Sequence, residues 1–231
     1  MQKIREKVVV FTGSGISAES GLATFRDSGG LWERYRIEDV ATADAWRRNP
    51  ELVLEFYNAR RAQLEVVEPN AAHRAIARLE QHFETQVITQ NVDDLHERAG
   101  SSRILHVHGE LTRARSSRHP ELVYDIGTAP IRPWQLCERG SRLRPHIVWF
   151  GELVMHLEEA VAHFEQADRV LVAGTSLSVY PVAGLLEYAP KDAEKVIVAL
   201  ELDSVPEGFR FLKGTASTLV PELVEQWCGA G

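Results

Sequence analysis

The sequence is poor in cysteine, in long apolar runs and in positive charge, and each shortage excludes a class of protein. Only two cysteines occur among 231 residues, Cys137 and Cys228, which is too few for a disulfide framework or a four-cysteine zinc site. No apolar stretch is long enough to span a bilayer, and the first seven residues are too charged for a signal peptide. We therefore expect a cytoplasmic protein.

The charge balance also limits the partners. The formal net charge is -7, which argues against binding to nucleic acid or to an anionic membrane. No internal repeat or low-complexity tract is visible, and 44% hydrophobic residues are ordinary for a globular protein. We expect one domain over residues 1–231, and the sequence gives no indication of the oligomeric state.

Short apolar runs alternate with helical segments along the chain. The runs lie at residues 8–11, 86–89, 104–107, 147–150, 170–173 and 196–200, and the helices at 50–67, 71–82, 93–99, 155–166, 182–189 and 221–227. This alternation predicts an α/β fold, a Rossmann-like open parallel sheet with helices on both faces. Two segments, 27–70 and 111–144, break the pattern, and we expect these insertions to form a small module over the strand ends.

The first apolar run leads into a glycine turn, Gly13-Ser14-Gly15. Such a turn lets backbone N–H groups approach a pyrophosphate at a helix N-terminus. Short glycine patterns recur by chance, but every other apolar run also ends in polar residues. Ligands of open α/β sheets bind outside the carboxyl ends of the strands, so these clusters together indicate a dinucleotide site.

Five motifs appear in a fixed order. They are Gly13-Ser14-Gly15-Ile16-Ser17 with Phe25-Arg26, Thr89-Gln90-Asn91-Val92-Asp93, His108-Gly109, Val148-Trp149-Phe150-Gly151-Glu152 and Gly174-Thr175-Ser176. In order and spacing they resemble the sirtuins, in particular the bacterial CobB-type NAD-dependent protein-lysine deacylases. The resemblance covers about residues 7–227. It implies that NAD is a co-substrate, that nicotinamide is released, and that the acyl group moves from lysine to ADP-ribose.

The resemblance implies two catalytic residues, His108 as general base and Asn91 as the group that orients a water or the ribose. Histidine suits a base because its pKa lies near neutral pH. We expect His106 to face away from the site and to be structural. Asn91 has an alternative role as the cap of the helix at 93–99.

The resemblance also implies which residues bind NAD. They are Gly13, Ser14, Gly15, Ser17, Glu19, Thr24, Phe25, Arg26, Trp32, Gln90, Asn91, Asp93, Gly174, Thr175, Ser176, Glu201 and Ala216. The segment from Phe25 to Trp32 is expected to close over the cofactor. Glu201 stands where many sirtuins have Asn; its carboxylate can accept both ribose hydroxyls and would repel a 2′-phosphate, so we expect NAD rather than NADP.

Substrate contacts are expected from two places. The main chain at Val148, Phe150, Gly151 and Glu152 is expected to pair with the acyl-lysine peptide. Tyr57 and Arg60, three residues apart on a predicted helix, share a face and resemble the Tyr-x-x-Arg signature of class III sirtuins, which accept succinyl-, malonyl- or glutaryl-lysine. The alternative is a solvated basic helix face.

Most sirtuins carry four zinc cysteines, but here the corresponding segment holds only Cys137. A mixed site of Cys137, His119 and Asp125 is the alternative, and we expect no metal. Three other functions share parts of the pattern: an NAD-dependent dehydrogenase, a non-catalytic NAD-binding module, and an NAD glycohydrolase or ADP-ribosyltransferase. The dehydrogenase explains the glycine turn but not His108-Gly109.

Overall fold

Six parallel strands form the central sheet of the protein. The computed structural model describes residues 5–22 and 35–229. The strand order is β3-β2-β1-β7-β8-β9, and all neighbours are parallel. The strands are β1 (Lys7–Thr12), β2 (Glu84–Thr89), β3 (Ile104–His106), β7 (Arg169–Ala173), β8 (Glu194–Ala199) and β9 (Arg210–Lys213). The predicted open parallel sheet is confirmed.

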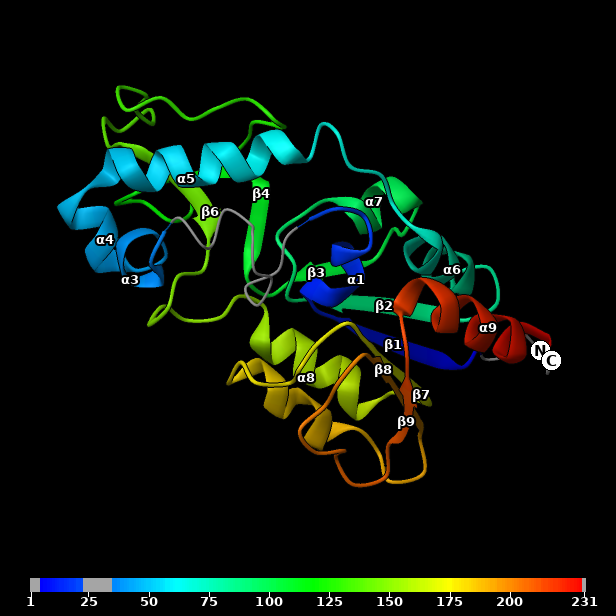
Figure 1. Cartoon of the computed structure of the whole chain (residues 1–231). Helices are drawn as coiled ribbons and strands as arrows, with labels where there is room; N and C mark the ends of the chain where they lie inside the picture. Colours follow the sequence, from blue (N-terminus) through cyan, green and yellow to red (C-terminus); the bar gives the residue numbers. More distant parts are fainter. Residues whose placement is uncertain (1–4, 23–34, 230–231) are drawn as a thin grey trace.

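Helices cover both faces of this sheet (Figure 1). On one face lie α6 (Ala71–Leu79) and α9 (Ala216–Gly229), and on the other lie α8 (Leu157–Glu165) and the 3-10 helix η1 (Val182–Tyr188). Strand β1 shows why its sequence is continuously apolar: Val8 and Val10 pack on the first face, and Val9 and Phe11 on the second. A strand buried on both faces has no polar alternation. No helix of the described residues is long and apolar enough to cross a membrane.

A small module lies at one end of the large sheet (Figure 1). It contains an antiparallel sheet of β4 (Gly109–Ser116), β5 (Val123–Asp125) and β6 (Leu143–Ile147) in the order β5-β4-β6. The helices α3 (Ile37–Val40), α4 (Ala43–Arg48) and α5 (Pro50–Gln63) pack with it. Pro50 at the first turn of α5 and Asn49 as its cap explain where this helix begins.

The predicted fourth strand, residues 147–150, does not join the parallel sheet. Ile147 ends β6 and lies opposite Gly109 in the small antiparallel sheet. Beyond it, the Val148 N–H donates to the His108 carbonyl, and the Phe150 N–H to the Ala41 carbonyl. The run is apolar because Ile147 and its neighbour Trp149 enter the core of the small module, not because helices cover it on two faces.

The sheet also has an edge strand that the sequence pattern did not indicate. Strand β9 has exposed residues at both ends and two half-buried residues between them, and it pairs with β8 at the edge of the sheet. The last helix begins at Ala216, before the predicted start at residue 221, although Pro221 lies within it. Two short helices complete the described chain, α1 (Ser14–Ala18) and α7 (Leu95–Ala99).

Asn58 on α5 joins the helix to the rest of the small module. Its amide donates to the Ile131 carbonyl and its oxygen accepts from the Ile131 N–H, both at 2.9 Å. The same oxygen accepts from the fully buried Arg61, whose Nε donates to the Leu111 carbonyl at 2.6 Å. Burial lowers the pKa of Arg61 to about 10, so this charge depends on such acceptors.

We expect Asn58→Ala to lower the free energy of unfolding by about 2–3 kcal/mol, because two main-chain groups and a buried guanidinium lose partners. Urea unfolding of the purified protein measures it. The exposed Glu65→Ala is the control and should stay within about 0.5 kcal/mol of the parent. Equal stability of the two variants would contradict the role given to Asn58.

Candidate active site

The order of the strands places a crevice between β1 and β7. From β1 the chain goes to β2 and β3 on one side, whereas β7, β8 and β9 continue on the other. The loops that leave β1 and β7 therefore separate at their carboxyl ends. Such a switch point is where open α/β sheets bind ligands. Figure 1 shows α1, which follows β1, at this end of the sheet, facing the small module.

The two loops touch through glycines. The Gly13 N–H donates to the Ala173 carbonyl and the Gly15 N–H to the Gly174 carbonyl, at 3.1 and 2.7 Å. A Cβ on Gly15 would lie 2.8 Å from the Gly174 oxygen, and one on Gly174 would lie 2.1 Å from the Ile16 nitrogen. Gly174 also has a φ of 66°, which favours glycine. The backbone is thus bare where a pyrophosphate would approach the start of α1.

Side chains from the loop after β2 contact both glycine loops. Gln90 accepts a hydrogen bond from Thr175 at 2.9 Å, and the Asn91 amide donates to Ser17 at 3.0 Å. Asp93 also bonds Ser17, and it caps the Leu95 N–H at 3.2 Å. Burial raises the pKa of Asp93. The structure therefore brings these predicted NAD-binding residues together in one place.

His108 lies beside this group with a defined tautomer. Its Nδ1 is 3.2 Å from the Gln90 carbonyl. Because a carbonyl only accepts, Nδ1 carries the proton and Nε2 keeps its lone pair. Burial lowers the pKa of His108, with the Gln90 carbonyl acting in the opposite direction. A neutral imidazole with a free nitrogen is the form a general base requires.

The sequence led us to expect that His106 faces away from the site, but its ring contacts the loop that carries Asn91. Its Nδ1 donates to the Asn91 carbonyl at 3.0 Å, and its Nε2 donates to Glu97 at 2.7 Å. Both partners are acceptors, so both nitrogens carry protons. Burial opposes this charge, but the hydrogen bond and the charge of Glu97 outweigh it and raise the pKa of His106. The ring contacts the same loop as His108, since His106 bonds the Asn91 carbonyl and His108 bonds the Gln90 carbonyl.

Tyr57 and Arg60 lie on one face of α5, and Tyr57 contacts Trp149. The Trp149 Nε1–H donates to the Tyr57 hydroxyl oxygen at 3.1 Å. Burial raises the pKa of Tyr57 to about 12, so the phenol keeps its proton and can donate it. The Arg60 guanidinium lies 5.9 Å from the Tyr57 ring centroid. Burial lowers the pKa of Arg60, while Tyr57 and Asp93 raise it, which places Arg60 in the electrostatic reach of the Asn91–Asp93 loop.

Other predicted site residues lie around this centre. Glu19 accepts from the Ser217 N–H at 3.2 Å and from its hydroxyl, next to the buried Ala216. Ser14 and Glu201 are exposed, and the Ser176 hydroxyl bonds that of Ser178 at 2.8 Å. The predicted residues Thr24, Phe25, Arg26 and Trp32 lie outside the described residues.

A family model described as "Sir2 family" matches residues 13–181. This span includes both glycine loops, His108 and the segment after β6. The chain belongs to the Sir2 family. Proteins named NAD-dependent protein deacylase are similar to it: one from Bacteroides thetaiotaomicron is 52% identical and covers 84% of this chain and 85% of its own. Another, from Vibrio parahaemolyticus, is 46% identical over 95% and 94%.

Solved Sir2 structures have the same fold. A Sir2 homologue in complex with ADP-ribose is 38% identical, with a TM-score of 0.90, over 98% of this chain and 93% of that one. A Sir2 homologue in complex with NAD has a TM-score of 0.87 at 37% identity, over 98% and 91%. Both structures hold an adenine dinucleotide or its ADP-ribose part, the kind of ligand expected at the two glycine loops.

In the described part of this Sir2 chain, hydrogen bonds engage the residues considered for a mixed zinc site. The Ser116 hydroxyl accepts from the His119 N–H at 3.1 Å and from Cys137, and the Cys137 sulfur accepts from the Ser141 N–H at 3.4 Å. Asp125 caps the turn at residue 127. Among the described residues no group of three or more His, Cys, Asp or Glu side chains could hold a metal ion. Hydrogen bonds therefore join these loops, and no step of the chemistry is assigned to a metal.

Several main-chain N–H groups of the segment 148–152 already have hydrogen-bond partners within the chain. The N–H groups of Val148, Phe150 and Glu152 donate to main-chain carbonyls. The Glu152 carboxylate accepts from Arg144 and Arg115. We infer that a peptide here would use carbonyl groups and Gly151 rather than the whole strand, and that Glu152 positions the segment.

Sequence reasoning missed the buried polar residues that pack against the loop carrying Asn91. Thr12 donates to Thr89 at 2.8 Å and contacts His96 Nε2 at 3.0 Å, and Thr89 accepts from the Asn91 N–H. Glu97 was also missed. Polar residues within buried strands were the available signal, since a buried hydroxyl requires a partner.

We expect Gly174→Ala to destabilise the protein by about 2 kcal/mol or more, because the methyl group enters the Gly15–Ile16 backbone and φ is positive. ADP-ribose binding should be lost with it. Gly184→Ala is the control, because its Cβ would only reach ordinary contact at 3.9 Å. The measurement is thermal unfolding with and without ADP-ribose. Equal melting and binding of both variants would contradict the close contact.

We expect His108→Asn to reduce turnover by about a hundredfold or more, the usual contribution of a general base. Because burial lowers the pKa of His108, the parent should lose activity only as the pH falls below the ordinary histidine value of about 6.5. The variant should lack this acid limb. The exposed His82→Asn is the control. A parent whose activity already declines well above that pH would rule out a buried neutral histidine as the base.

Proposed function

We propose that this protein is an NAD-dependent protein-lysine deacylase that favours acyl groups ending in a carboxylate: succinyl, malonyl or glutaryl. The deacylase activity is the one named for its relatives, and a related structure is bound to a myristoylated histone peptide. The acidic preference rests on one observation, the pairing of the buried Tyr57 with the half-buried Arg60 on one face of α5. We also propose that the whole chain acts as one catalytic domain in the cytoplasm, where the two cysteines stay free.

The chain's own groups divide the work of the proposed reaction. NAD supplies the ADP-ribose that receives the acyl group. The glycine loops carry no side chains that would keep its pyrophosphate away from the backbone at the start of α1, and Gln90 and Thr175 lie ready to contact a ribose. Asn91 and Asp93 lie at the nicotinamide end. His108 Nε2 takes the proton from a ribose hydroxyl, while the Gln90 carbonyl keeps the imidazole in the required tautomer.

The acyl end is recognised by groups that are fixed before binding. Trp149 occupies one lone pair of the Tyr57 oxygen, so the hydroxyl proton is directed to another acceptor. The Arg60 guanidinium adds a planar fork that matches a carboxylate. A charge-assisted hydrogen bond contributes about 1.5–3 kcal/mol, which corresponds to tenfold or more in favour of a carboxylated acyl group over acetyl.

We expect Arg60→Met to reduce kcat/KM for succinyl-lysine peptides by tenfold or more and to leave deacetylation nearly unchanged, because only the charged acyl group loses a partner. Nicotinamide release from acetyl-, succinyl-, malonyl- and glutaryl-lysine peptides measures it. The exposed Arg74→Met on α6 is the control. An equal loss with every peptide would remove the acidic preference, and nicotinamide release without peptide would instead indicate an NAD glycohydrolase.

A further inference from the structure

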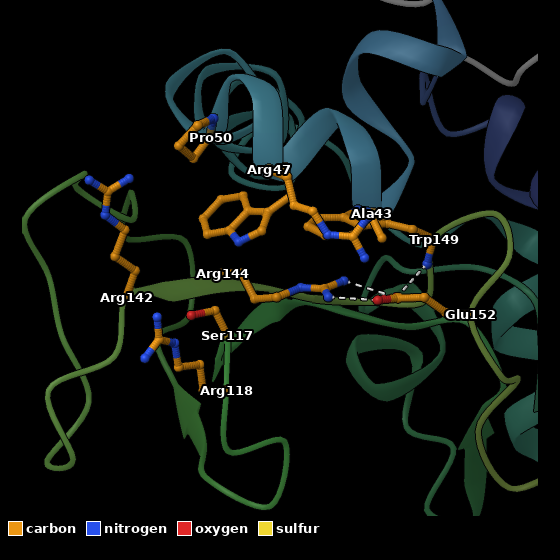
Figure 2. A pocket seen from close by; sticks show the side chains of 10 residues that line it. Ala43, Arg47, Pro50, Ser117, Arg118, Arg142, Arg144, Trp149 and Glu152 are labelled. Carbon is orange, nitrogen blue, oxygen red and sulfur yellow. Dashed lines mark hydrogen bonds and ion pairs between the residues drawn. The ribbon is translucent and has the colours of Figure 1, made fainter.

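A cavity of about 450 Å³ lies on the small module, apart from the crevice between β1 and β7. Its walls come from α4, from the start of α5, from the loop after β4 and from the strand β6 (Figure 2). None of the glycine loops, and neither His108 nor Asn91, lines it. It shares only Trp149 and Glu152 with the segment expected to contact the acyl-lysine peptide.

The cavity is basic although the chain as a whole is acidic. Arg47, Arg118, Arg142 and Arg144 line it, against the single acid Glu152. Figure 2 shows Arg118 and Arg142 at one end and the Arg144–Glu152 pair at the other. A local excess of guanidinium groups within a chain of net charge -7 creates a focused positive potential.

Glu152 neutralises only part of the positive charge of these four arginines. Its two oxygens accept from Arg144 at 2.7 and 2.9 Å, and one of them also accepts from Arg115 at 3.1 Å. Arg47 pairs with Asp44 on its own helix. Among the described residues, neither Arg118 nor Arg142 has a side-chain ion pair.

Arg144 adds a largely buried positive charge to the wall of the cavity. Its guanidinium lies 3.3 Å from the centroid of the Trp149 ring, and its side chain is 9% exposed. The Nε atom is closed off from solvent and has no hydrogen-bond partner among the described residues, so it does not donate into the cavity. Arg144 therefore contributes its charge to the cavity, and the exposed Arg118 and Arg142 contribute the accessible donors.

We propose that this cavity binds a small, multiply charged oxyanion of the phosphate-chain type carried by nucleotides. Guanidinium groups match phosphate oxygens with two parallel hydrogen bonds, and here four of them from separate segments of the chain line one cavity. Trp46 and Pro50 add apolar walls against which a planar base can lie. The volume is within the range of small-molecule sites, about 300–1,000 Å³. This site is distinct from the proposed NAD site and does not depend on the acyl preference.

Inorganic tripolyphosphate is the probe, titrated by calorimetry into the purified protein. We expect Arg118→Gln/Arg142→Gln to weaken its affinity by about tenfold or more, because two charge-assisted contacts disappear. Arg78→Gln/Arg132→Gln, two exposed arginines outside the cavity, removes the same charge and should change it by less than about twofold. All four substituted side chains are exposed, and equal melting temperatures verify the folds.

Three results would overturn the proposal. The first is no binding of tripolyphosphate to the parent. The second is equal affinity of the parent and Arg118→Gln/Arg142→Gln, which would place the anion at the glycine loops or at no defined site. The third is tighter binding of a tetraglutamate peptide with the same dependence on Arg118 and Arg142, which would assign the cavity to carboxylates of a protein substrate.

Discussion

The contact between the two glycine loops is the constraint on which the rest of the site depends. It joins the carboxyl ends of β1 and β7 through main-chain hydrogen bonds, at Gly13 to Ala173 and at Gly15 to Gly174. A side chain at either loop would separate them. The separation would also break the link between Thr175 and Gln90, and thus move the loop that carries Asn91 and holds His108. Cofactor binding and base positioning therefore share one backbone requirement.

The pKa values of two histidines two residues apart are shifted in opposite directions because of their partners. His108 meets only a carbonyl, so burial prevails and its pKa is lowered. His106 meets a carbonyl and the Glu97 carboxylate, which raise its pKa in spite of burial. Through its Nδ1, His106 holds the carbonyl of Asn91, the residue next to the Gln90 that His108 bonds. His106 thereby fixes the loop on which His108 depends.

The sequence predicted the parallel sheet and most of the site because those features are local. The apolar residues of a buried strand such as β1 predict that strand by themselves, and the glycine turn directly follows it. The run at 147–150 was misassigned because its apolar character does not reveal which layer it enters; its partner in β4 is almost forty residues away. The same holds for His106. Its role depends on Glu97, which local periodicity does not connect to it. The hydroxyls of Thr12 and Thr89 were missed for the same reason, because they meet only when β1 and β2 pair.

Trp149 connects α5 with β6 in the small module. Its ring nitrogen fixes the Tyr57 hydroxyl, while its ring face carries Arg144. Arg144 is in turn held by Glu152, which also accepts the Trp149 N–H at 2.9 Å. The proposed acyl pocket and the basic cavity thus contact the same indole, one at its N–H edge and the other at its ring face. A ligand that draws the Arg144 guanidinium toward the cavity would loosen the contact that orients Trp149, and so weaken the fixed direction of the Tyr57 proton. The rigidity of the proposed acid-selective pocket is therefore coupled to the occupancy of the basic cavity.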